Sequence, residues 1–289
     1  MAVILITGTN GQLGSELRRA SKNYYGYDFI FTDIDTLDIT ARAEINSFAE
    51  KHAPDWIINC AAYNFVDRAE SEPDKALLIN GIAVKNIAES IKGSDARLVH
   101  ISSDYVYEGS SNVPYNEDAE TNPAGAYGRS KLEGEKAAML HNAAMIIRTS
   151  WLYSSYGSNF VKTIISKARE KESLRVVYDQ TGTPTYAADL ADAILNIVSG
   201  VIRNKLAFAA GIYNYSNEGV CSWYDLAVET VIEAGLNCKI IPILSSEYHS
   251  SAKRPYYSVL DKAKIKETYN IDIPHWRDSL KKCIKVIMK

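Results

Sequence analysis

Two side chains near the middle of the chain have the types and the spacing needed to move a proton to a carbonyl substrate. Tyr127 and Lys131 lie four residues apart, so a helix would place both on one face. A phenol with a pKa of ~10 exchanges protons poorly at neutral pH, and a neighbouring ammonium group helps by stabilising the phenolate. An ordinary exposed Tyr/Lys pair has the same spacing, so the pair alone leaves both interpretations open.

A run of polar residues strengthens the catalytic interpretation. Ser102, Ser103 and Asp104 follow the apolar run that starts at Leu98. In open parallel sheets, ligands bind at the carboxyl ends of the strands, so a hydroxyl there can polarise a substrate carbonyl. A serine, a tyrosine and a lysine together suit reversible hydride transfer, in which the hydroxyl and phenol stabilise oxyanion charge and a nicotinamide cofactor supplies the hydride.

A glycine-rich turn near the start of the sequence is suited to the pyrophosphate of such a cofactor. Gly8, Gly11 and Gly14 have the spacing G-x-x-G-x-x-G and separate an apolar run from a helical pattern. Glycines allow a tight turn and a close approach to phosphate, and the helix N-terminus presents free N–H groups to the anion. The sequence therefore predicts a dinucleotide site at this turn.

An acidic residue stands where the adenosine ribose is expected. Asp33 ends the next apolar run, 19 residues after Gly14, close to the usual spacing of ~20, with Asp35 as a nearby alternative. An aspartate favours NAD, but Arg18 and Arg19 could reach a 2′-phosphate, so both NADH and NADPH stay open as cofactors. A simple loop cap is the other interpretation of Asp33.

The pattern of the chain predicts an α/β fold that brings these motifs to one edge. Apolar runs of strand length alternate with helical spacings, which favours a Rossmann-type doubly wound parallel sheet with helices on both faces. The predicted strands are Val3 to Thr7, Phe29 to Asp33, Trp56 to Cys60, Leu98 to Ser102 and Ala144 to Thr149. The predicted helices between them are Gln12 to Ala20, Ala41 to His52, Pro73 to Ile91 and Tyr127 to His141.

The last third has a different character and predicts a smaller α/β substrate-binding lobe. Helical patterns at Ala187 to Ser199, Tyr224 to Ala234 and Trp276 to Ile287 are separated by short strand candidates and many turn residues. We expect residues 1–150 to form the NAD(P)-binding domain and residues 151–289 to form mainly the second lobe, with some later segments crossing back.

The composition excludes several classes of function. Of the 289 residues, 46% are hydrophobic and 23% charged, and the formal net charge is −3 without blocks of either sign, so no nucleic acid or membrane partner is expected. No apolar run approaches the ~18 residues that span a bilayer, and none resembles a signal peptide, which predicts a cytoplasmic protein. The four cysteines and five histidines show no ligand spacing, so no metal site is predicted.

Taken together, the motifs resemble the extended short-chain dehydrogenase/reductase family. Within it, the sequence is similar to the branch that reduces the C4 keto group of dTDP-4-dehydro-6-deoxy-L-mannose to give dTDP-L-rhamnose. The stretches that carry the resemblance span nearly the whole chain: Gly8 to Gly14, Leu37 to Thr40, Asn59 to Tyr63, Val66 to Glu70, Ser102 to Tyr107, Tyr127 to Lys131, Arg148 to Tyr153 and Asp179 to Thr185.

The resemblance implies roles for individual residues. Ser103, at a position that is usually threonine, Tyr127 as proton donor and Lys131 as its pKa-lowering partner would be catalytic. The cofactor site would be formed by the glycine turn, the strand ends and the catalytic motif: Gly8, Asn10, Gly11, Gln12, Leu13, Gly14, Asp33, Asp38, Ile39, Ala61, Ala62, Tyr63, Ser102, Tyr127 and Lys131. The substrate site would contain Asp104, Tyr105, Trp151, whose ring can cover a sugar face, and Arg254, whose fork suits phosphate.

Two other functions stay open at this point. One is a reductase or epimerase of another nucleotide-sugar. The other is a non-catalytic subunit, since a relative with this fold is the regulatory subunit of a methionine adenosyltransferase. Ser103, Tyr127 and Lys131 together favour an enzyme, because a pure binding subunit has no chemical need for them. The resemblance also allows a homodimer.

Overall fold

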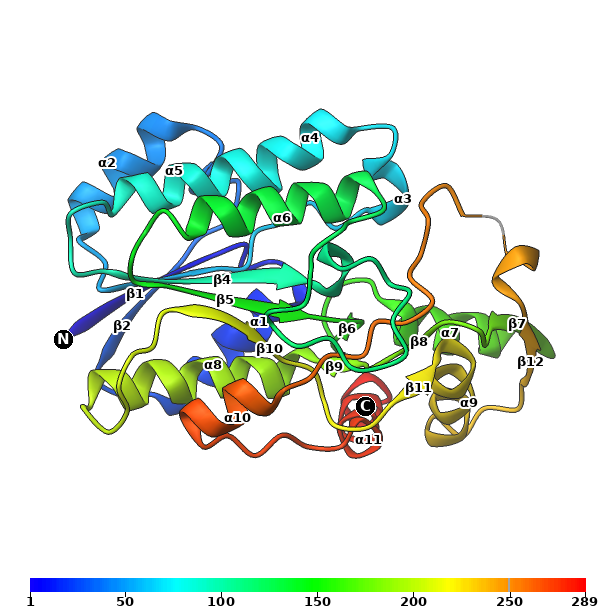
Figure 1. Ribbon diagram of the computed structural model, residues 1–289. Coiled ribbons are helices and arrows are strands. Elements are labelled where there is room, and N and C mark those ends of the chain that lie inside the picture. Colours follow the sequence, from blue (N-terminus) through cyan, green and yellow to red (C-terminus); the bar gives the residue numbers. More distant parts are fainter. Residues whose placement is uncertain (249) are drawn as a thin grey trace.

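A six-stranded parallel sheet forms the centre of the protein in the computed structural model, which describes residues 1–248 and 250–289 (Figure 1). Its strands are β1 (Ala2–Thr7), β2 (Tyr27–Phe31), β3 (Trp56–Asn59), β4 (Arg97–Ser103), β5 (Ala144–Thr149) and β10 (Gly211–Asn214). They pair in the order β10-β5-β4-β3-β1-β2. The strand order reverses between β1 and β3, and ligands of such sheets bind outside the carboxyl ends at the reversal.

Helices cover both faces of the sheet, which confirms the predicted doubly wound fold. α2 (Arg42–His52), α5 (Ala83–Ser90) and α6 (Ala126–Ala138) lie on one face, and α1 (Gln12–Ala20) and α8 (Ala187–Ile202) on the other (Figure 1). Side chains of a strand alternate between faces. Ile4 and Ile6 accordingly pack in the core beneath α1 and α8, whereas Leu5 packs in the core beneath α2 and α5.

The helix predicted over residues 73–91 is interrupted. It consists of α4 (Pro73–Leu77), a π-helical turn (Leu78–Ile82) and α5, and a short helix, α3 (Val66–Ala69), precedes it. Within the π turn, the side chain of Asn80 accepts a hydrogen bond from the Tyr63 N–H at 2.8 Å and donates to the Ser130 hydroxyl at 2.9 Å. The turn therefore ties the loop after β3 to α6 at the edge where ligands bind.

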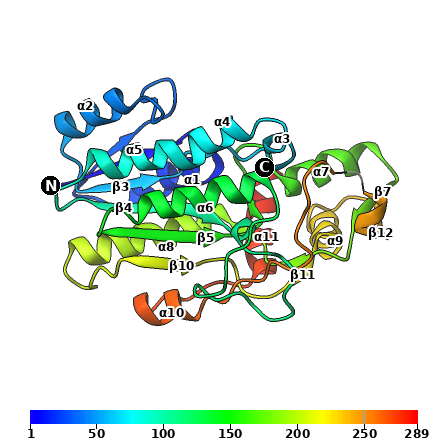
Figure 2. The same cartoon turned by 45° about the horizontal axis from the view of Figure 1, so that its top comes forward.

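A smaller α/β lobe lies beyond the carboxyl ends of the main strands (Figures 1 and 2). β7 (Ser173–Val177) pairs in parallel with β12 (Lys239–Ile243), and α7 (Phe160–Glu170), α9 (Trp223–Glu233) and α11 (Trp276–Ile287) pack around them. Two further strand pairs join β6 (Leu152–Tyr153) to β9 (Thr185–Tyr186) and β8 (Thr181–Gly182) to β11 (Cys221–Ser222).

Three elements from the second half of the chain belong to the larger body. β10 completes its sheet, α8 packs on α1, and α10 (Ala263–Tyr269) packs against β10. The remaining short elements are 3₁₀ turns at Ser21–Asn23, Asp104–Val106 and Ser245–Glu247. In the part of the chain that the structure describes, no helix is both long and apolar enough to span a lipid bilayer.

Candidate functional site

The proposed proton donor lies in the first turn of α6, against the end of β4. The Tyr127 phenol donates a hydrogen bond to Asn64 Oδ1 at 3.3 Å, and its ring packs edge-on against Tyr105 at 5.3 Å between centroids. Burial raises the pKa of Tyr127 above its ordinary value, while the nearby Ser103 hydroxyl acts in the opposite direction. The phenol is therefore protonated at neutral pH, as a proton donor must be.

Ser103 caps the 3₁₀ turn that follows β4. Its hydroxyl oxygen accepts the Tyr105 N–H at 3.2 Å, and its hydrogen is donated to Asp104 Oδ1 at 2.9 Å. Because β4 ends at Ser103 and α6 begins at Ala126, the hydroxyl and the Tyr127 phenol meet at one edge of the sheet. The structure thus brings together two of the three residues predicted to be catalytic.

Lys131 lies one helical turn further along α6 and is buried. Its ammonium donates to the carbonyl oxygen of Ile101 at 2.6 Å. Burial lowers the pKa of Lys131 to about 8, with Glu135 acting in the opposite direction. The sequence predicts that Lys131 lowers the pKa of Tyr127. In this structure burial has the largest effect on that pKa and raises it, and the Lys131 ammonium donates to the Ile101 carbonyl.

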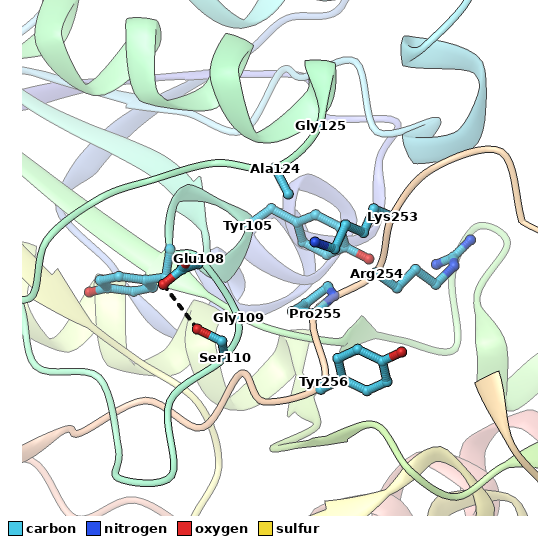
Figure 3. A pocket seen from close by; sticks show the side chains of 11 residues that line it. Tyr105, Glu108, Gly109, Ser110, Ala124, Gly125, Lys253, Arg254, Pro255 and Tyr256 are labelled. Atoms are coloured by element: carbon cyan, nitrogen blue, oxygen red, sulfur yellow. Dashed lines mark hydrogen bonds between the residues drawn. The ribbon is translucent and has the colours of Figure 1, made fainter. Parts of the chain in front are cut away.

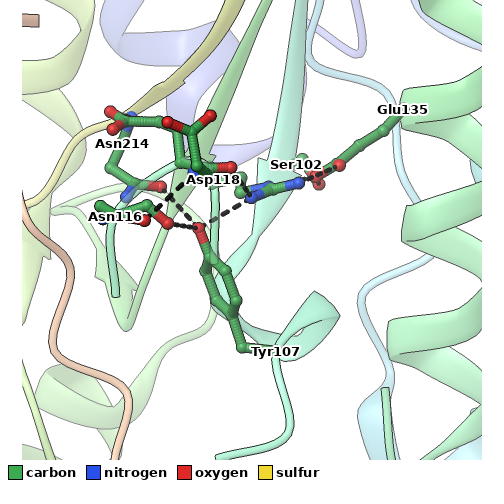
Figure 4. A network of polar contacts seen from close by, with 8 residues as sticks. Ser102, Tyr107, Asn116, Asp118, Glu135 and Asn214 are labelled. Atoms are coloured by element: carbon green, nitrogen blue, oxygen red, sulfur yellow. Dashed lines mark hydrogen bonds and ion pairs between the residues drawn. The ribbon is translucent and has the colours of Figure 1, made fainter. Parts of the chain in front are cut away.

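A buried ion pair fixes α6 to the sheet (Figure 4). Glu135 accepts hydrogen bonds from Arg148 Nε at 2.8 Å and Nη2 at 2.7 Å, and both side chains are only 3% exposed. The Ser102 hydroxyl also donates to Glu135, at 2.5 Å, and Arg148 Nη1 donates to the Tyr107 hydroxyl at 2.8 Å. Ser102, predicted to contact the cofactor, therefore uses its hydroxyl inside this network.

The start of α6 is held by a second carboxylate. The Ala126 N–H donates to Glu70 Oε1 at 2.7 Å, and Gly125, just before it, leaves room for that oxygen, because a Cβ on Gly125 would lie only 2.6 Å from it. Sequence reasoning missed Glu70, Asn64 and Glu135. Glu135 could have been found, because it continues the four-residue spacing of Tyr127 and Lys131.

The glycine turn fits the pyrophosphate of a dinucleotide. Gly8 has a φ of +67°, and a Cβ added there would lie 2.5 Å from the Ala61 nitrogen. A Cβ on Gly14 would lie 2.4 Å from the Gly8 carbonyl oxygen. α1 starts after Gly11, and no side chain of the described residues caps it there, so its first N–H groups face outward for an anion.

Asp33 lies directly against this turn. Its carboxylate accepts the Asn10 N–H at 2.8 Å and the Ile34 N–H at 2.9 Å. The turn and the end of β2 are thereby joined at the point where a dinucleotide places its adenosine ribose. These residues fit a nicotinamide dinucleotide in backbone shape and in donor set.

The other predicted cofactor residues lie around the same edge, and several of them are buried or hydrogen-bonded to other protein groups. Leu13 and Ile39 are buried in the core, and Gln12 accepts from the Asn159 side chain at 2.9 Å. Asp38 accepts the Thr40 N–H at 2.9 Å. In the loop after β3, Ala61 lies against Gly8 and precedes Ala62, and the Tyr63 hydroxyl donates to Glu72 at 2.9 Å.

Two of the predicted substrate residues converge on Ser258. Asp104 is buried, burial raises its pKa to about 7, and Ser258 faces its carboxyl group. Asp104 Oδ2 and Ser258 Oγ have no hydrogen-bond partner among the described residues within ordinary bonding distance. The ring of Trp151 lies close to the same serine, on the other side of Gly182. A Cβ on Gly182 would lie 2.5 Å from Ser258 Oγ and 2.7 Å from the ring, so only a glycine leaves room for both.

Trp151 is held in a constrained position. Its backbone is left-handed, with a φ of +47°, which is costly for a bulky residue, and its ring stacks on Trp223 at 3.6 Å and 10°. Trp223, at the start of α9, was not predicted, because nothing in the local sequence links it to Trp151. The stack orients a rigid aromatic plane beside Ser258.

Arg254 and Tyr105 line a pocket formed by the segment after β4, the residues just before α6 and the segment 253–256 (Figure 3). The pocket has a volume of about 200 Å³ and is lined by Lys253, Pro255 and Tyr256 and by the loop around Gly109. Arg254 Nη2 donates to Asp67 Oδ2 at 2.7 Å, and the Ala252 N–H donates to Asp67 Oδ1 at 3.1 Å. The two cations beside an aromatic hydroxyl suit an anionic ligand such as a diphosphate.

Within residues 1–248 and 250–289, no group of three or more His, Cys, Asp and Glu side chains is arranged to hold a metal ion. Two carboxylates already accept hydrogen bonds from protein side chains: Glu16 accepts from Arg19 and Ser154, and Asp189 accepts from Asn217 and Ser279.

Known proteins are similar to this chain over nearly its whole length. The family described as "RmlD substrate binding domain" matches residues 1–288. The spore coat polysaccharide biosynthesis protein SpsK of Bacillus subtilis is 40% identical over 99% of this chain and 98% of its own length. The dTDP-4-dehydrorhamnose reductase of Sinorhizobium fredii is 36% identical over 99% and 97%. The crystal structure of dTDP-4-dehydrorhamnose reductase from Bacillus anthracis in complex with NADP has a TM-score of 0.92 at 38% identity, and covers 99% of this chain and 100% of that one.

Proposed function

The chain belongs to the RmlD substrate binding domain family, and from this premise we propose that it is a dTDP-4-dehydrorhamnose reductase. It would reduce the C4 keto group of dTDP-4-dehydro-6-deoxy-L-mannose to dTDP-L-rhamnose, with NADPH or NADH as cofactor. The observation that carries the proposal is the protonated phenol of Tyr127 beside the Ser103 hydroxyl, at the same sheet edge as the glycine turn.

In this proposal the protein's own residues control the proton. When bound at the glycine turn, the cofactor supplies the hydride that reaches C4 of the sugar. The Tyr127 hydroxyl gives its proton to the C4 oxygen, and the Ser103 hydroxyl donates a hydrogen bond to the same oxygen. Lys131 is buried one turn away, and its positive charge compensates the phenolate left on Tyr127.

The substrate residues divide the nucleotide-sugar between them. Trp151 and Asp104 border the space beside Ser258, where we place the deoxysugar. Arg254 and Lys253 at the neighbouring pocket would take the diphosphate, with Tyr105 between the two regions. The division into a cofactor-binding part, residues 1–150, and a mainly substrate-binding part, residues 151–289, belongs to the same proposal, as does a homodimer, which sedimentation would test.

The decisive experiment is oxidation of NADPH and NADH at 340 nm with enzymatically generated dTDP-4-dehydro-L-rhamnose, with the product identified by mass and sugar NMR. We expect dTDP-L-rhamnose from the wild type and a loss of kcat of roughly 10²- to 10⁴-fold in Tyr127→Phe. Tyr25→Phe is the matched control, because Tyr25 is 84% exposed.

Unchanged turnover in Tyr127→Phe would overturn the assignment of the proton donor. Cofactor binding without any turnover by the wild type would favour a reductase or epimerase of another nucleotide-sugar, or a non-catalytic subunit. Ser103→Thr is expected to keep activity and Ser103→Ala to lose it, because only the first retains the hydroxyl.

A further inference from the structure

The segment 250–258, called the strap below, forms one wall of the pocket that the proposed function assigns to the diphosphate. It supplies four of the lining residues, Lys253 to Tyr256 (Figure 3). Among the described residues, the strap belongs to no helix or strand: it follows the 3₁₀ turn Ser245–Glu247 and precedes α10. Its polar backbone groups therefore need partners elsewhere in the protein, and these partners determine where the wall of the pocket lies.

The second half of the strap is fixed by its backbone. The N–H groups of Tyr256 and Tyr257 donate to the Gly109 carbonyl oxygen at 3.1 and 3.0 Å. The Ser258 N–H donates to the Thr181 carbonyl oxygen at 2.8 Å. Because these bonds join backbone groups, they stay in place when a side chain is changed.

The first half of the strap is held by one side chain. Asp67 Oδ1 accepts the Ser250 hydroxyl at 2.7 Å and the Ala252 N–H at 3.1 Å. Asp67 Oδ2 accepts Arg254 Nη2 at 2.7 Å. Burial acts to raise the pKa of Asp67, but the contacts with the strap outweigh it and the pKa is lowered, so the carboxylate is charged at neutral pH.

Asp67 itself is fixed to the larger body of the protein. It lies on α3, and Ala69 of that helix belongs to one apolar cluster with Tyr127 of α6. The carboxylate therefore has a defined place relative to the helix of the proposed proton donor. Since the first half of the strap has no regular structure, Asp67 positions the strap rather than the reverse.

Arg254 keeps donors for a ligand while Asp67 holds it. Its Nη2 contacts Asp67 and its Nε donates to Ser250 Oγ at 3.2 Å, which uses two of its five N–H donors among contacts within the described residues. An arginine that is already oriented loses less conformational entropy when it binds an anion. The negative charge of Asp67 acts in the opposite direction, because it repels an anion. The two effects differ in sign, so an experiment can separate them.

We propose that Asp67 is a positioning residue, which holds the strap and orients Arg254 toward the diphosphate of the nucleotide-sugar. The inference rests on the proposed function in that Arg254 is taken to bind this diphosphate. It predicts that removing an acid beside the pocket weakens the binding of an anion, which is the opposite of what the charge alone would do.

The test is calorimetric titration of the purified full chain with dTDP, UDP and NADPH. Asp67→Ala removes all three contacts and is expected to weaken the nucleoside diphosphate about tenfold, with NADPH changed by less than about twofold. Asp67→Asn keeps Oδ1 for the strap but turns an amide N–H toward Arg254, so a smaller weakening of about threefold is expected. Asp74→Asn, an exposed acid at the start of α4, is the matched control and should change neither ligand.

Trypsin gives a second measurement that needs no ligand. Lys253 is exposed, so the bond to Arg254 is a site for the protease, whereas the bond from Arg254 to Pro255 resists it. Cleavage after Lys253, followed by mass spectrometry, should be at least about threefold faster in Asp67→Ala, because the first half of the strap is released. Asp67→Asn should be cleaved nearly as slowly as the wild type.

A double-mutant cycle tests whether Asp67 acts through the arginine. In an Arg254→Ala background, Asp67→Asn should no longer weaken the nucleoside diphosphate. In the reductase assay, Asp67→Asn should raise KM for the nucleotide-sugar and leave kcat unchanged. An undiminished effect of Asp67→Asn without Arg254 would overturn the inference.

Two further results would overturn it as well. Equal or tighter binding of the nucleoside diphosphate by Asp67→Ala would show that Asp67 acts only as an opposing charge. Unchanged cleavage after Lys253 in that variant would show that Asp67 does not hold the strap. A wild type that binds dTDP or UDP without reducing the sugar counts against the proposed function alone, whereas a wild type that binds neither overturns both.

Discussion

Replacing Glu135 by glutamine should cost the protein about 3–5 kcal/mol of its free energy of unfolding. Glu135 lies on the inner side of α6 and Arg148 on β5, and both side chains are 3% exposed. The neutral amide would leave the guanidinium charge uncompensated in the interior. It would also turn an N–H donor toward a guanidinium that has only donors.

The magnitude follows from the contacts that are lost. The Glu135 carboxylate accepts two hydrogen bonds from Arg148 and one from Ser102. Two of the three bonds end on Oε1, so a glutamine that keeps this oxygen loses the bond from Arg148 Nη2, and hydrogen bonds to charged groups contribute about 1.5–3 kcal/mol each. The uncompensated guanidinium charge adds to this loss and brings the total to about 3–5 kcal/mol. A globular protein has a total stability of about 5–15 kcal/mol, so this single change would remove a large part of it.

The assay is equilibrium urea unfolding followed by circular dichroism, in a double-mutant cycle with Arg148→Met. The double variant should recover part of the loss, since two neutral groups need no mutual compensation. Glu133→Gln is the matched control on the same helix, because its ion pair with Lys136 is exposed and contributes at most about 1 kcal/mol. A loss below about 1 kcal/mol in Glu135→Gln, equal to the control, would refute the reasoning.

Three further changes probe the site. Asn64→Leu removes the acceptor that orients the Tyr127 phenol, so kcat should fall about tenfold with dinucleotide affinity unchanged; an equal kcat would show that Asn64 does not orient the phenol. Burial raises the pKa of Asp104 from the ordinary value of 3.8 to about 7, so the folded state holds the proton more tightly than the unfolded state. The free energy of unfolding therefore falls as the pH rises from 3.8 to 7, by at most roughly 4 kcal/mol. Asp104→Asn has no proton to lose, so the urea midpoint of the variant should rise relative to that of the wild type between pH 5 and pH 8. A difference between the two midpoints that does not change with pH would contradict the raised pKa. Gly14→Ala places a methyl 2.4 Å from the Gly8 carbonyl oxygen, so dinucleotide affinity measured by titration should fall at least about tenfold, and an unchanged affinity would mean that the turn adapts.

The regular elements of this fold could be predicted because their periodicity is local. α1 and α11 have the bounds that the spacing of apolar residues indicates, and the five predicted strands all form. The interruption of the helix after Pro73 could not be predicted, because the π turn is fixed by bonds from Asn80 to Tyr63 and Ser130, which are distant in sequence. β10 was not predicted for the same reason: its pairing with β5 joins segments more than sixty residues apart.

The candidate site divides in the same way. Gly8 to Gly14 and Tyr127 to Lys131 are compact motifs whose chemistry depends on neighbours along the chain, so they could be found from the sequence. The stack of Trp151 on Trp223 depends on the folded chain and could not. Arg148 is an intermediate case. A charged residue inside an otherwise apolar strand needs a buried partner, but the sequence does not indicate which acid supplies it.

That acid turns out to lie on the same helix as the proposed chemistry. Tyr127, Lys131 and Glu135 follow one another at intervals of four on one face of α6, so the reactive end and the anchored end of the face belong to one rigid element. Sliding α6 by one residue would turn this face by about 100° and separate Glu135 from Arg148. The buried ion pair therefore sets the rotation of α6, and the positions of the Tyr127 phenol and the Lys131 ammonium follow from it. For this reason Glu135→Gln should lower kcat as well as stability, whereas Glu133→Gln on the outer side should lower neither.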